Sequence, residues 1–304
     1  MKFIDLHCDT ASRLFYEKDL SLRESICKVD IEKLKAGDAL MQMFAFFIDL
    51  GEIKRSPFEE FSLMHENFMK ELRKNKNEIE IFKDKIDLNK LYACLTIEEG
   101  EVLEGNPYNV EKVKDMGIKA ITLTWNYENS IGYPNFEFKH KDEGLKKVGF
   151  DIVDEMERFN IVPDCSHLSD KGFWDLIEHT KKPFIATHSN SRSVQNHPRN
   201  LTDEMLKALG NKGGLTGINF CVDFVAPKEI AMVEDLVKHM VHIKNKAGIE
   251  SLGLGSDFDG IENEVEIKDC SQMNILIEEM VKNNFTMDEI EKVFYKNAMR
   301  IFCK

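Results

Sequence analysis

Short apolar runs alternate along the chain with longer segments whose apolar residues recur at helical spacing. The short runs are rich in β-branched and aromatic residues, as buried strands are, and the longer segments have the pattern of amphipathic helices. The expected strands lie near residues 3–6, 40–46, 92–96, 120–124, 161–166, 184–187, 215–219 and 251–255. The expected helices lie at residues 57–74, 144–159, 202–209, 231–247 and 287–302.

This alternation predicts βα units around a parallel sheet. Eight expected strands, with no internal repeat and no Pro/Gly-rich linker to divide the chain, favour a closed (β/α)8 barrel over an open doubly wound sheet. We therefore expect an α/β protein with a single TIM-type barrel domain over residues 1–304. In such barrels the catalytic groups lie at the C-terminal ends of the strands, so the residues that follow each strand are the candidates for chemistry.

Composition narrows the class of protein. The 304 residues are 42% hydrophobic and 31% charged, which is ordinary for a globular protein. The net charge of -13 disfavours a nucleic-acid partner. The 7 cysteines form no C-x-x-C pair and are expected to be reduced thiols. Because no long apolar segment is visible, we expect a cytoplasmic protein without a membrane partner.

Candidate metal ligands follow several of the expected strands. His7 and Asp9 come directly after the first strand, and residues two apart in extended chain point the same way. Further ionisable residues at or beyond the strand ends are Glu98, His167, His188, Arg199 and Asp257. Buried ionisable groups cost free energy unless they are paired or bind a metal. Three imidazoles and two carboxylates exceed the needs of one catalytic zinc ion, but they suit two zinc ions that share a carboxylate.

For single residues the pattern leaves alternatives open. A His-x-Asp pair is common by chance, and composition does not distinguish Glu98 from Glu99 or Glu101 as a ligand. Asp257 lies in an Asp-Phe-Asp-Gly stretch that is also good turn chemistry, and Arg199 has the alternative of an ordinary surface residue. Their joint position at strand ends is what favours a functional role.

Seven short stretches around these candidates form an ordered set of motifs. They are Asp5-Leu6-His7-Cys8-Asp9-Thr10, Ile97-Glu98-Glu99-Gly100, Ile121-Thr122-Leu123-Thr124-Trp125-Asn126, Asp164-Cys165-Ser166-His167-Leu168-Ser169-Asp170, Thr187-His188-Ser189-Asn190, Arg199-Asn200-Leu201 and Gly255-Ser256-Asp257-Phe258-Asp259-Gly260. In order and spacing this set resembles the renal, or membrane, dipeptidase family of zinc metallopeptidases, and the similarity covers nearly the whole chain.

The resemblance implies a ligand set and a reaction. His7, Asp9 and Glu98 would hold one zinc ion. Glu98 would also hold the second zinc ion, together with His167 and His188, and would thus bridge the pair. A hydroxide that bridges the metals would attack the peptide bond of a dipeptide, a substrate class that could include dipeptides with a C-terminal D-residue.

The resemblance implies two further roles. Asp257 resembles the family's catalytic aspartate, which takes the proton from the attacking water and passes it to the leaving amine. Arg199 resembles the residue that binds the free C-terminal carboxylate of the substrate, for which a planar guanidinium offers a bidentate match. The resemblance also suggests a homodimer.

The chain departs from the family pattern at two substrate-contact positions. Trp125 stands where the well-studied mammalian members have a histidine that is thought to contact the developing oxyanion, and we expect it to be a pocket wall whose indole could also donate. Cys221 stands where the mammalian pattern places a tyrosine. Cys165 is expected to lie deeper in the barrel as a small apolar residue. The remaining histidines are expected to be mostly solvated, with His197 left open: His65, His140, His179, His197, His239 and His242.

Three functions remain in view at this point. The ligand set favours a zinc dipeptidase, whereas the changed Trp125 and Cys221 keep open an amidohydrolase acting on N-acyl amino acids or another small amide. A metal-dependent binding protein without catalysis is the third. Asp257 argues against the third function, because a purely structural zinc site is closed and needs no extra carboxylate.

Overall fold

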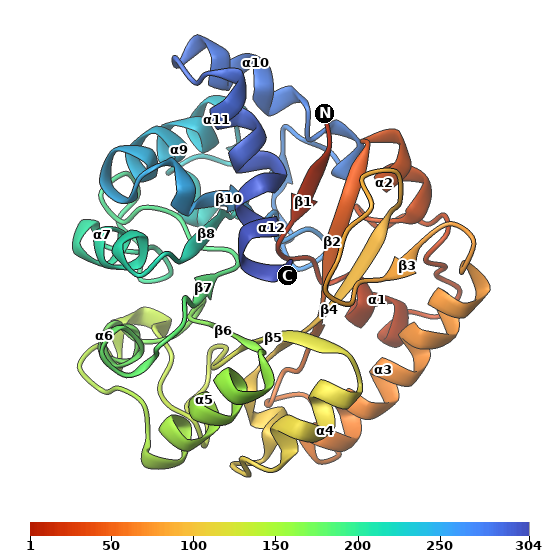
Figure 1. Ribbon diagram of the computed structural model, residues 1–304, viewed down its shortest axis with the longest axis vertical. Helices are drawn as coiled ribbons and strands as arrows, with labels where there is room; N and C mark the ends of the chain where they lie inside the picture. The colour runs from red at the N-terminus through yellow and green to blue at the C-terminus, as the bar shows by residue number, and fades with distance from the viewer. Residues whose placement is uncertain (304) are drawn as a thin grey trace.

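The computed structural model describes residues 1–303 and contains a closed barrel of eight parallel strands (Figure 1). The barrel strands are β1 (Phe3–Asp5), β2 (Ala39–Phe47), β4 (Tyr92–Glu98), β5 (Ile118–Thr122), β6 (Val162–Asp164), β7 (Ile185–Ala186), β8 (Leu215–Ile218) and β10 (Leu252–Leu254). They pair in the order β2-β1-β10-β8-β7-β6-β5-β4, and β4 pairs with β2 to close the ring. Each coincides with an expected strand, so the predicted (β/α)8 fold is confirmed.

Three short strands lie outside this ring. β3 (Glu80–Ile81) pairs with the start of β4. β9 (Ile230–Ala231) and β11 (Glu264–Val265) form a separate two-stranded sheet. None of the three was predicted, because two residues are too few to show a hydrophobic period.

Helices surround the barrel, and four of them agree with the prediction (Figure 1). These are α3 (Pro57–Lys74), α5 (Lys147–Phe159), α7 (Asp203–Asn211) and α9 (Val233–Ala247). Local sequence explains their ends. The side chain of Ser56 caps α3 by accepting a hydrogen bond from the backbone N of Glu59. α5 ends at Asn160, which adopts the left-handed conformation with φ 57°.

The predicted helix over residues 287–302 is present and has a π-helical stretch in its middle. α11 (Met287–Glu291) and α12 (Asn297–Phe302) are separated by a π-helical turn over Lys292–Lys296. Six helices were not predicted, since the longest has 10 residues and shows few helical turns. They are α1 (Thr10–Tyr16), α2 (Ile31–Ala36), α4 (Asn109–Asp115), α6 (Asp170–His179), α8 (Val222–Val225) and α10 (Ile275–Lys282). Short 3-10 turns occur at Gly100–Leu103, Phe136–Phe138, Ile249–Ser251 and Cys270–Gln272.

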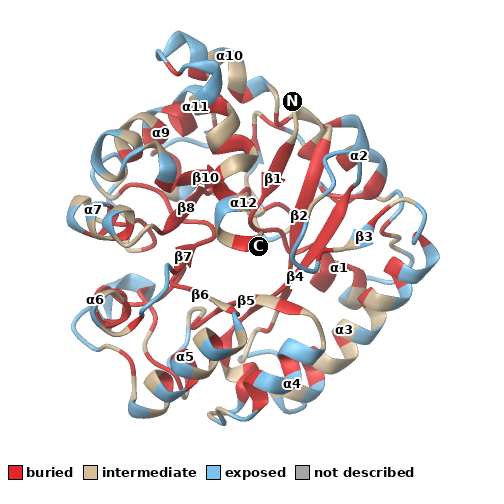
Figure 2. Ribbon diagram, viewed as in Figure 1, coloured by how far each residue is buried: buried red, intermediate tan, exposed pale blue. Residues whose placement is uncertain are grey.

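Apolar side chains fill the space between strands and helices and the interior of the ring. The strands are buried along their length, whereas the helices turn exposed faces outward (Figure 2). Phe302 of α12 joins an inner cluster with Ile4, Met43 and Leu215 from the barrel strands. Cys165 is buried, as expected for a small apolar residue. No helix in the described part of the chain is both long and apolar enough to cross a membrane.

Candidate metal centre

The five predicted ligands converge at the C-terminal ends of the barrel strands. His7 and Asp9 follow β1, Glu98 is the last residue of β4, His167 follows β6, and His188 follows β7. All five are buried, with at most 7% of their surface exposed. They form two groups of three, in each of which the ligand atoms lie within 4.8 Å of one another. The structure therefore brings together every ligand position proposed from the sequence.

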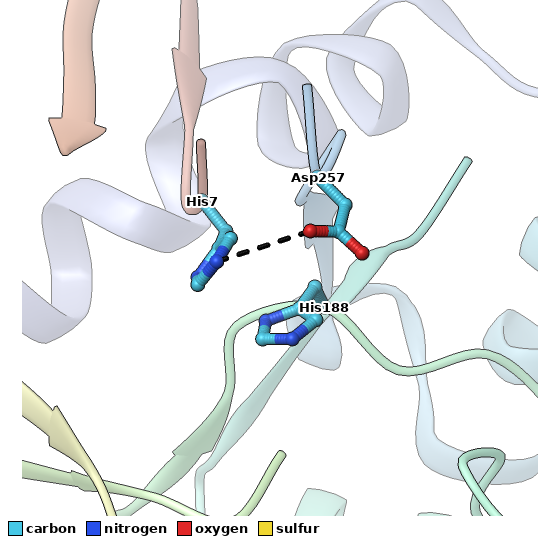
Figure 3. A group of neighbouring side chains, drawn as sticks. All are labelled: His7, His188 and Asp257. Carbon is cyan, nitrogen blue, oxygen red and sulfur yellow. Dashed lines mark ion pairs between the residues drawn. The ribbon is translucent and has the colours of Figure 1, made fainter. Parts of the chain in front are cut away.

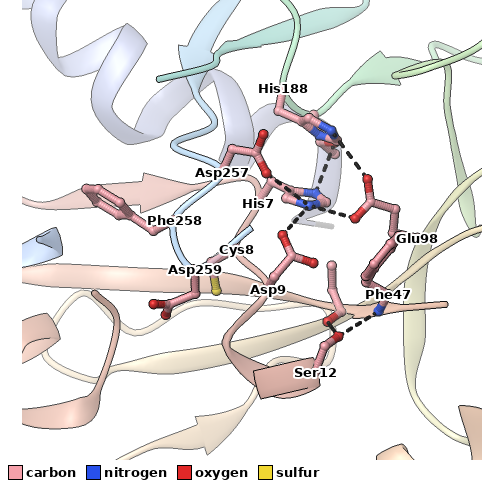
Figure 4. Close-up of polar contacts among 12 residues, drawn as sticks. His7, Cys8, Asp9, Ser12, Phe47, Glu98, His188, Asp257, Phe258 and Asp259 are labelled. Atoms are coloured by element: carbon pink, nitrogen blue, oxygen red, sulfur yellow. Dashed lines mark hydrogen bonds and ion pairs between the residues drawn. The ribbon is translucent and has the colours of Figure 1, made fainter. Parts of the chain in front are cut away.

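Glu98 lies between the two groups, and its carboxylate oxygens face different imidazoles (Figure 4). Oε2 lies 3.2 Å from Nε2 of His7. Oε1 lies 3.2 Å from Nε2 of His167 and 3.5 Å from Nε2 of His188. Asp9 belongs to the first group, with Oδ2 3.4 Å from Nε2 of His7. One carboxylate is thus shared by two ligand groups, which is the arrangement that a bridging ligand requires.

Some polar atoms of the cluster have no hydrogen-bond partner in the described part of the chain. Nε2 of His7 and Oδ1 of Asp9 are buried without a hydrogen-bond partner among the described residues. Nε2 of His167 and Nε2 of His188 face each other at 3.1 Å. Unpartnered buried polar atoms are costly, whereas imidazole nitrogens and carboxylate oxygens are the usual ligands of zinc. The residues present therefore fit a pair of metal ions, each with three protein ligands.

The pKa values of these groups reflect their close packing. Burial opposes the charge of His7, but the neighbouring Glu98 and Asp9 outweigh it and raise the pKa of His7 well above its ordinary value. Burial would raise the pKa of Glu98, but the imidazoles around it lower that pKa well below its ordinary range. Burial and the charge of Glu98 raise the pKa of Asp9 to about 8. Burial lowers the pKa of His167 to about 4 and the pKa of His188 well below its ordinary value, which leaves both rings neutral.

Asp257 lies beside the ligand cluster, in the loop after β10 (Figure 3). Its Oδ1 lies 3.9 Å from Nε2 of His7, and it forms a third group of candidate ligands with His7 and His188. Its Oδ2 accepts a hydrogen bond from Nδ2 of Asn219 at 2.8 Å. Burial raises the pKa of Asp257. One carboxylate oxygen is held in place while the other faces the cluster, which suits a group that accepts and returns a proton.

Three of the eleven non-glycine residues with positive φ in the described chain lie at or beside the cluster. His167 has φ 66°, Asp257 has φ 63°, and Glu99 has φ 103°. Residues with a Cβ rarely adopt this left-handed region, and they persist there where surrounding contacts hold them. Strained positions of this kind gather at functional sites, so the three angles agree with the position of the candidate centre.

Glu99 is a structural residue, and this resolves the choice among the neighbouring acidic residues. Its carboxylate accepts hydrogen bonds from the backbone N of Glu101, the backbone N of Trp125 and the side chain of Asn129. Burial raises its pKa to about 7. The carboxylate of Glu101 accepts from the backbone of the same loop, at Ser130. Of the three candidates only Glu98 faces the imidazoles.

Arg199 is a buried cation near the cluster. It is 4% exposed, and its guanidinium donates to Oγ of Ser189 and to the backbone O of His188. Its Nε has no partner among the described residues. His197, whose role the sequence left open, accepts a hydrogen bond from the backbone N of Arg199 through Nδ1. The ring of Phe224 lies over the guanidinium, 5.3 Å from its Cζ.

A cavity of about 750 Å³ opens onto the cluster. Asp9, Glu98, His167 and Asp257 line it together with Phe47, Trp125, Cys221 and Phe224. The rings of Trp125 and Phe47 meet edge to face with centroids 4.7 Å apart, so Trp125 is a cavity wall, as expected. Burial raises the pKa of Cys221 to about 12, which keeps this thiol protonated.

Three polar residues around the cluster were missed in the sequence. Oδ1 of Asn126 lies 3.1 Å from Nδ1 of His167, and Oγ1 of Thr187 lies 2.7 Å from Nδ1 of His188. Asn219 is the third, through its hydrogen bond to Asp257. Each lies in a motif or beside one, but a sequence motif does not show which way a side chain points.

The prediction that the remaining histidines are mostly solvated is wrong for His239. Its ring is fully buried. Nδ1 accepts a hydrogen bond from the backbone N of Ser191 at 3.1 Å, and Nε2 donates to the backbone O of Val225 at 2.9 Å. Burial lowers its pKa to about 4, so His239 is a neutral structural residue.

A parallel barrel with imidazoles and carboxylates gathered at its strand ends defines a metal-dependent hydrolase of the barrel type. Comparison with known families agrees. The model of the membrane dipeptidase family, peptidase family M19, matches residues 1–304, and the chain belongs to this family. It is thereby placed among the metal-dependent dipeptidases, which are peptide hydrolases.

Individual relatives support this assignment. An uncharacterized protein in the pqqA 5' region of Klebsiella pneumoniae is 29% identical over 67% of this chain and 79% of its own length. An uncharacterized dipeptidase of Schizosaccharomyces pombe is 33% identical over 62% of this chain and 47% of its own length. The chain spans about half the length of the fungal relatives it matches.

A solved structure shares the fold. A metallo peptidase from Rhodobacter sphaeroides, determined with a phosphinate mimic of the dipeptide L-Ala-D-Ala, has a TM-score of 0.91 to this chain. The two are 20% identical, and the match covers 99% of this chain and 98% of the other. At this identity the likeness concerns the fold.

Proposed function

We propose that this protein hydrolyses dipeptides at a site that holds two zinc ions. The observation that carries the proposal is Glu98, a single buried carboxylate whose oxygens face separate groups of imidazoles. His7 and Asp9 would complete one group of ligands, and His167 and His188 the other. Bound zinc ions would supply the Lewis acidity that polarises a peptide carbonyl and makes water nucleophilic at neutral pH.

Asp257 is the proposed acid and base. Asn219 holds its Oδ2, so that Oδ1 is turned toward the ligand cluster. A carboxylate in this position can take one proton from the attacking water and deliver it to the leaving amine, which balances the protons of peptide hydrolysis. The role needs no other proton donor.

Arg199 is the proposed anchor for the substrate's C-terminal carboxylate. A buried guanidinium whose Nε has no partner gains a charge-assisted hydrogen bond when a carboxylate approaches. The guanidinium does not line the cavity but contacts the backbone O of the ligand His188, so a carboxylate bound to it would lie close to the metal ions, which would favour dipeptides. The relative that binds a mimic of L-Ala-D-Ala supports a site that accepts a C-terminal D-residue.

The test is metal analysis of the purified protein together with a substrate panel. We expect about two zinc ions per chain and hydrolysis of dipeptides with L- or D-residues at the C-terminal position. We expect Asp257→Asn to keep its zinc and lose about 100- to 10,000-fold in kcat.

Two results would reject the proposal. Protein that binds no zinc would refute the metal site, and zinc-loaded protein that cleaves N-acyl amino acids but no dipeptide would establish the amidohydrolase alternative instead.

A further inference from the structure

Thr187 contacts His188 on the side of the ring opposite to the ligand nitrogen. Oγ1 of Thr187 lies 2.7 Å from Nδ1 of His188, whose Nε2 faces Glu98. The same Oγ1 lies 2.6 Å from Oδ2 of Asp164. Asp164, Thr187 and His188 are each at most 2% exposed. A carboxylate, a hydroxyl and an imidazole thus form a buried chain that ends at a candidate metal ligand.

Counting protons fixes the direction of each hydrogen bond in this chain. A hydroxyl carries one proton, and a carboxylate only accepts. The hydroxyl of Thr187 therefore donates to Asp164 and accepts from Nδ1 of His188. With the proton on Nδ1, the neutral ring has its lone pair on Nε2. That lone pair faces the ligand cluster, where a metal ion would receive it.

Asp164 is held so that this direction cannot reverse. Its Oδ1 accepts hydrogen bonds from the backbone N of Ser166 at 2.9 Å and the backbone N of Thr187 at 3.0 Å. Its Oδ2 also accepts from Oγ1 of Thr122 at 2.6 Å. With four donors around it, the carboxylate is saturated, and Thr187 has a fixed acceptor on one side.

The hydroxyl of Thr187 also approaches the other ligand group. Nδ1 of His7 lies 3.5 Å from Oγ1 of Thr187, and the rings of His7 and His188 lie with centroids 3.9 Å apart and planes tilted by 40°. Oγ of Ser166 lies 3.3 Å from the same oxygen, so of its two lone pairs one accepts from His188 at 2.7 Å and the other is approached by both Ser166 and His7. One side chain therefore reaches an imidazole in each of the two groups.

We propose that Thr187, anchored by Asp164, is a positioning residue for the metal centre. It holds a proton on Nδ1 of His188, so that Nε2 of this ring is free for a metal ion, and it contacts the ring of His7 over a longer distance. This inference rests on the proposed zinc site. Thr187 acts through the imidazoles, since neither it nor Asp164 lines the cavity. Hydrogen-bond partners of this kind orient metal ligands and raise their basicity.

Thr122 provides a matched control. Its hydroxyl donates to the same Oδ2 of Asp164 at the same 2.6 Å, and among residues 1–303 it forms no hydrogen bond with an imidazole nitrogen. Thr187→Val and Thr122→Val each remove one hydroxyl that donates a hydrogen bond to the carboxylate of Asp164. Only Thr187→Val also removes the acceptor for the ligand rings. The two variants therefore separate positioning of the ligands from support of Asp164.

The first readout is zinc affinity, measured on the full chain by competition with a chromophoric chelator. We expect Thr187→Val to weaken zinc binding about 10- to 100-fold, the usual effect of removing such a partner. We expect Thr122→Val to bind zinc like the wild type and Thr187→Ser to retain the wild-type affinity. Equal losses in the two valine variants, or no loss in Thr187→Val, would overturn the inference. If either valine variant does not fold, the Thr187→Ala and Thr122→Ala pair makes the same comparison.

The second readout is the imidazole proton itself. In zinc-loaded protein labelled with ¹⁵N-histidine, we expect an Nδ1–H resonance of His188 that is protected from exchange. It should persist in Thr187→Ser and Thr122→Val and lose its protection in Thr187→Val. A wild-type His188 whose Nδ1–H exchanges freely contradicts the inference.

The wild type separates this inference from the function on which it rests. A wild-type chain that binds no zinc refutes both. A wild-type chain that binds two zinc ions, alongside a Thr187→Val variant that binds them as tightly, refutes the inference alone.

Discussion

Asp5 and Asp9 flank His7 at the end of β1 and are both buried, yet their surroundings differ. Oδ1 of Asp5 accepts from the backbone N of Ser256, and its Oδ2 accepts from Oγ of Ser256 and Nε2 of Gln42. Oδ1 of Asp9 has no partner among the described residues, and its Oδ2 faces Nε2 of His7. Asp5 is a completed part of the barrel, whereas Asp9 is half of an incomplete site.

The buried histidines also differ in whether their ring nitrogens have hydrogen-bond partners. Both ring nitrogens of His239 are hydrogen-bonded to the backbone, whereas Nε2 of His7 has no partner although two carboxylates lie nearby. Burial of an ionisable group is therefore not what marks the site. The mark is a set of buried groups whose unsatisfied atoms face one another, because only a ligand can then offset the cost of their burial.

The largest expected effect comes from changing the shared carboxylate. Glu98→Gln keeps the shape of the side chain but removes the charge that serves both ligand groups. We expect loss of tightly bound zinc and a fall in kcat/KM of about a thousandfold or more, which corresponds to several kcal/mol of lost transition-state stabilisation. The measurements are zinc content after dialysis and dipeptide hydrolysis.

Glu99→Gln is the matched control for this substitution. Glu99 is adjacent and fully buried, but it holds the backbone of the Trp125 loop and faces no imidazole. The variant should keep both zinc ions and lose mainly stability. If Glu98→Gln retained two zinc ions while Glu99→Gln lost them, the bridging ligand would be Glu99 and our assignment of Glu98 would be wrong.

The next effect in size is the pH dependence of stability due to His239. Its pKa is about 4 in the folded protein, against 6.5 in the unfolded chain. As pH falls below 6.5 the unfolded chain takes up a proton that the folded protein refuses, so stability is complete above pH 6.5 and is lost progressively toward pH 4. The full loss is up to about 3 kcal/mol.

His239→Gln removes this titration while its amide can still donate to the backbone O of Val225. We expect the variant to lose less stability than the wild type between pH 6.5 and pH 4, measured by urea unfolding with chelator present. Other groups titrate equally in both proteins, so the difference between the two slopes reports His239. If the unfolding free energies of the two proteins changed equally between pH 6.5 and pH 4, the pKa of His239 would not be lowered in the folded protein.

A smaller effect distinguishes the two aspartates of β1. Asp5→Asn places an amide donor against the donors Ser256 and Gln42, and we expect it to lower the free energy of unfolding by about 2 kcal/mol with or without zinc. Asp9→Asn removes a carboxyl group whose ionisation is opposed by burial and by Glu98, so the metal-free protein should be as stable as the wild type or more stable. The wild type should gain more stability than Asp9→Asn when zinc is added, because the variant keeps only the second ligand group intact. An Asp9→Asn variant that is destabilised without zinc would contradict the comparison.

The sequence was sufficient for the barrel and for the positions of candidate ligands at its strand ends, because both depend on local pattern. Buried parallel strands are continuous apolar runs, and the ligands are the residues at which those runs end. The choice of Glu98 over Glu99 needed the structure or the family, since it depends on where the backbone turns, at a φ of 103° that no residue pattern announces. Thr187 was missed for a similar reason, because its partners Asp164 and His7 lie on other strands.

Asp257 has one carboxylate oxygen that is hydrogen-bonded, like those of Asp5, and one that faces the ligand cluster, like that of Asp9. The smallest predicted effect tests this arrangement. Oδ2 of Asp257 is satisfied by Asn219, and its Oδ1 is turned toward His7. Asn219→Ala should leave zinc bound and KM nearly unchanged, because its other hydrogen bonds are to the backbone of His188 and Cys221 and no ligand side chain is altered. The carboxylate would then be free to rotate away from the attacking water, and we expect kcat to fall about tenfold, or 1.4 kcal/mol. A rise in KM with unchanged kcat would instead make Asn219 part of the substrate pocket, and Asp257 would then need no partner to keep its orientation.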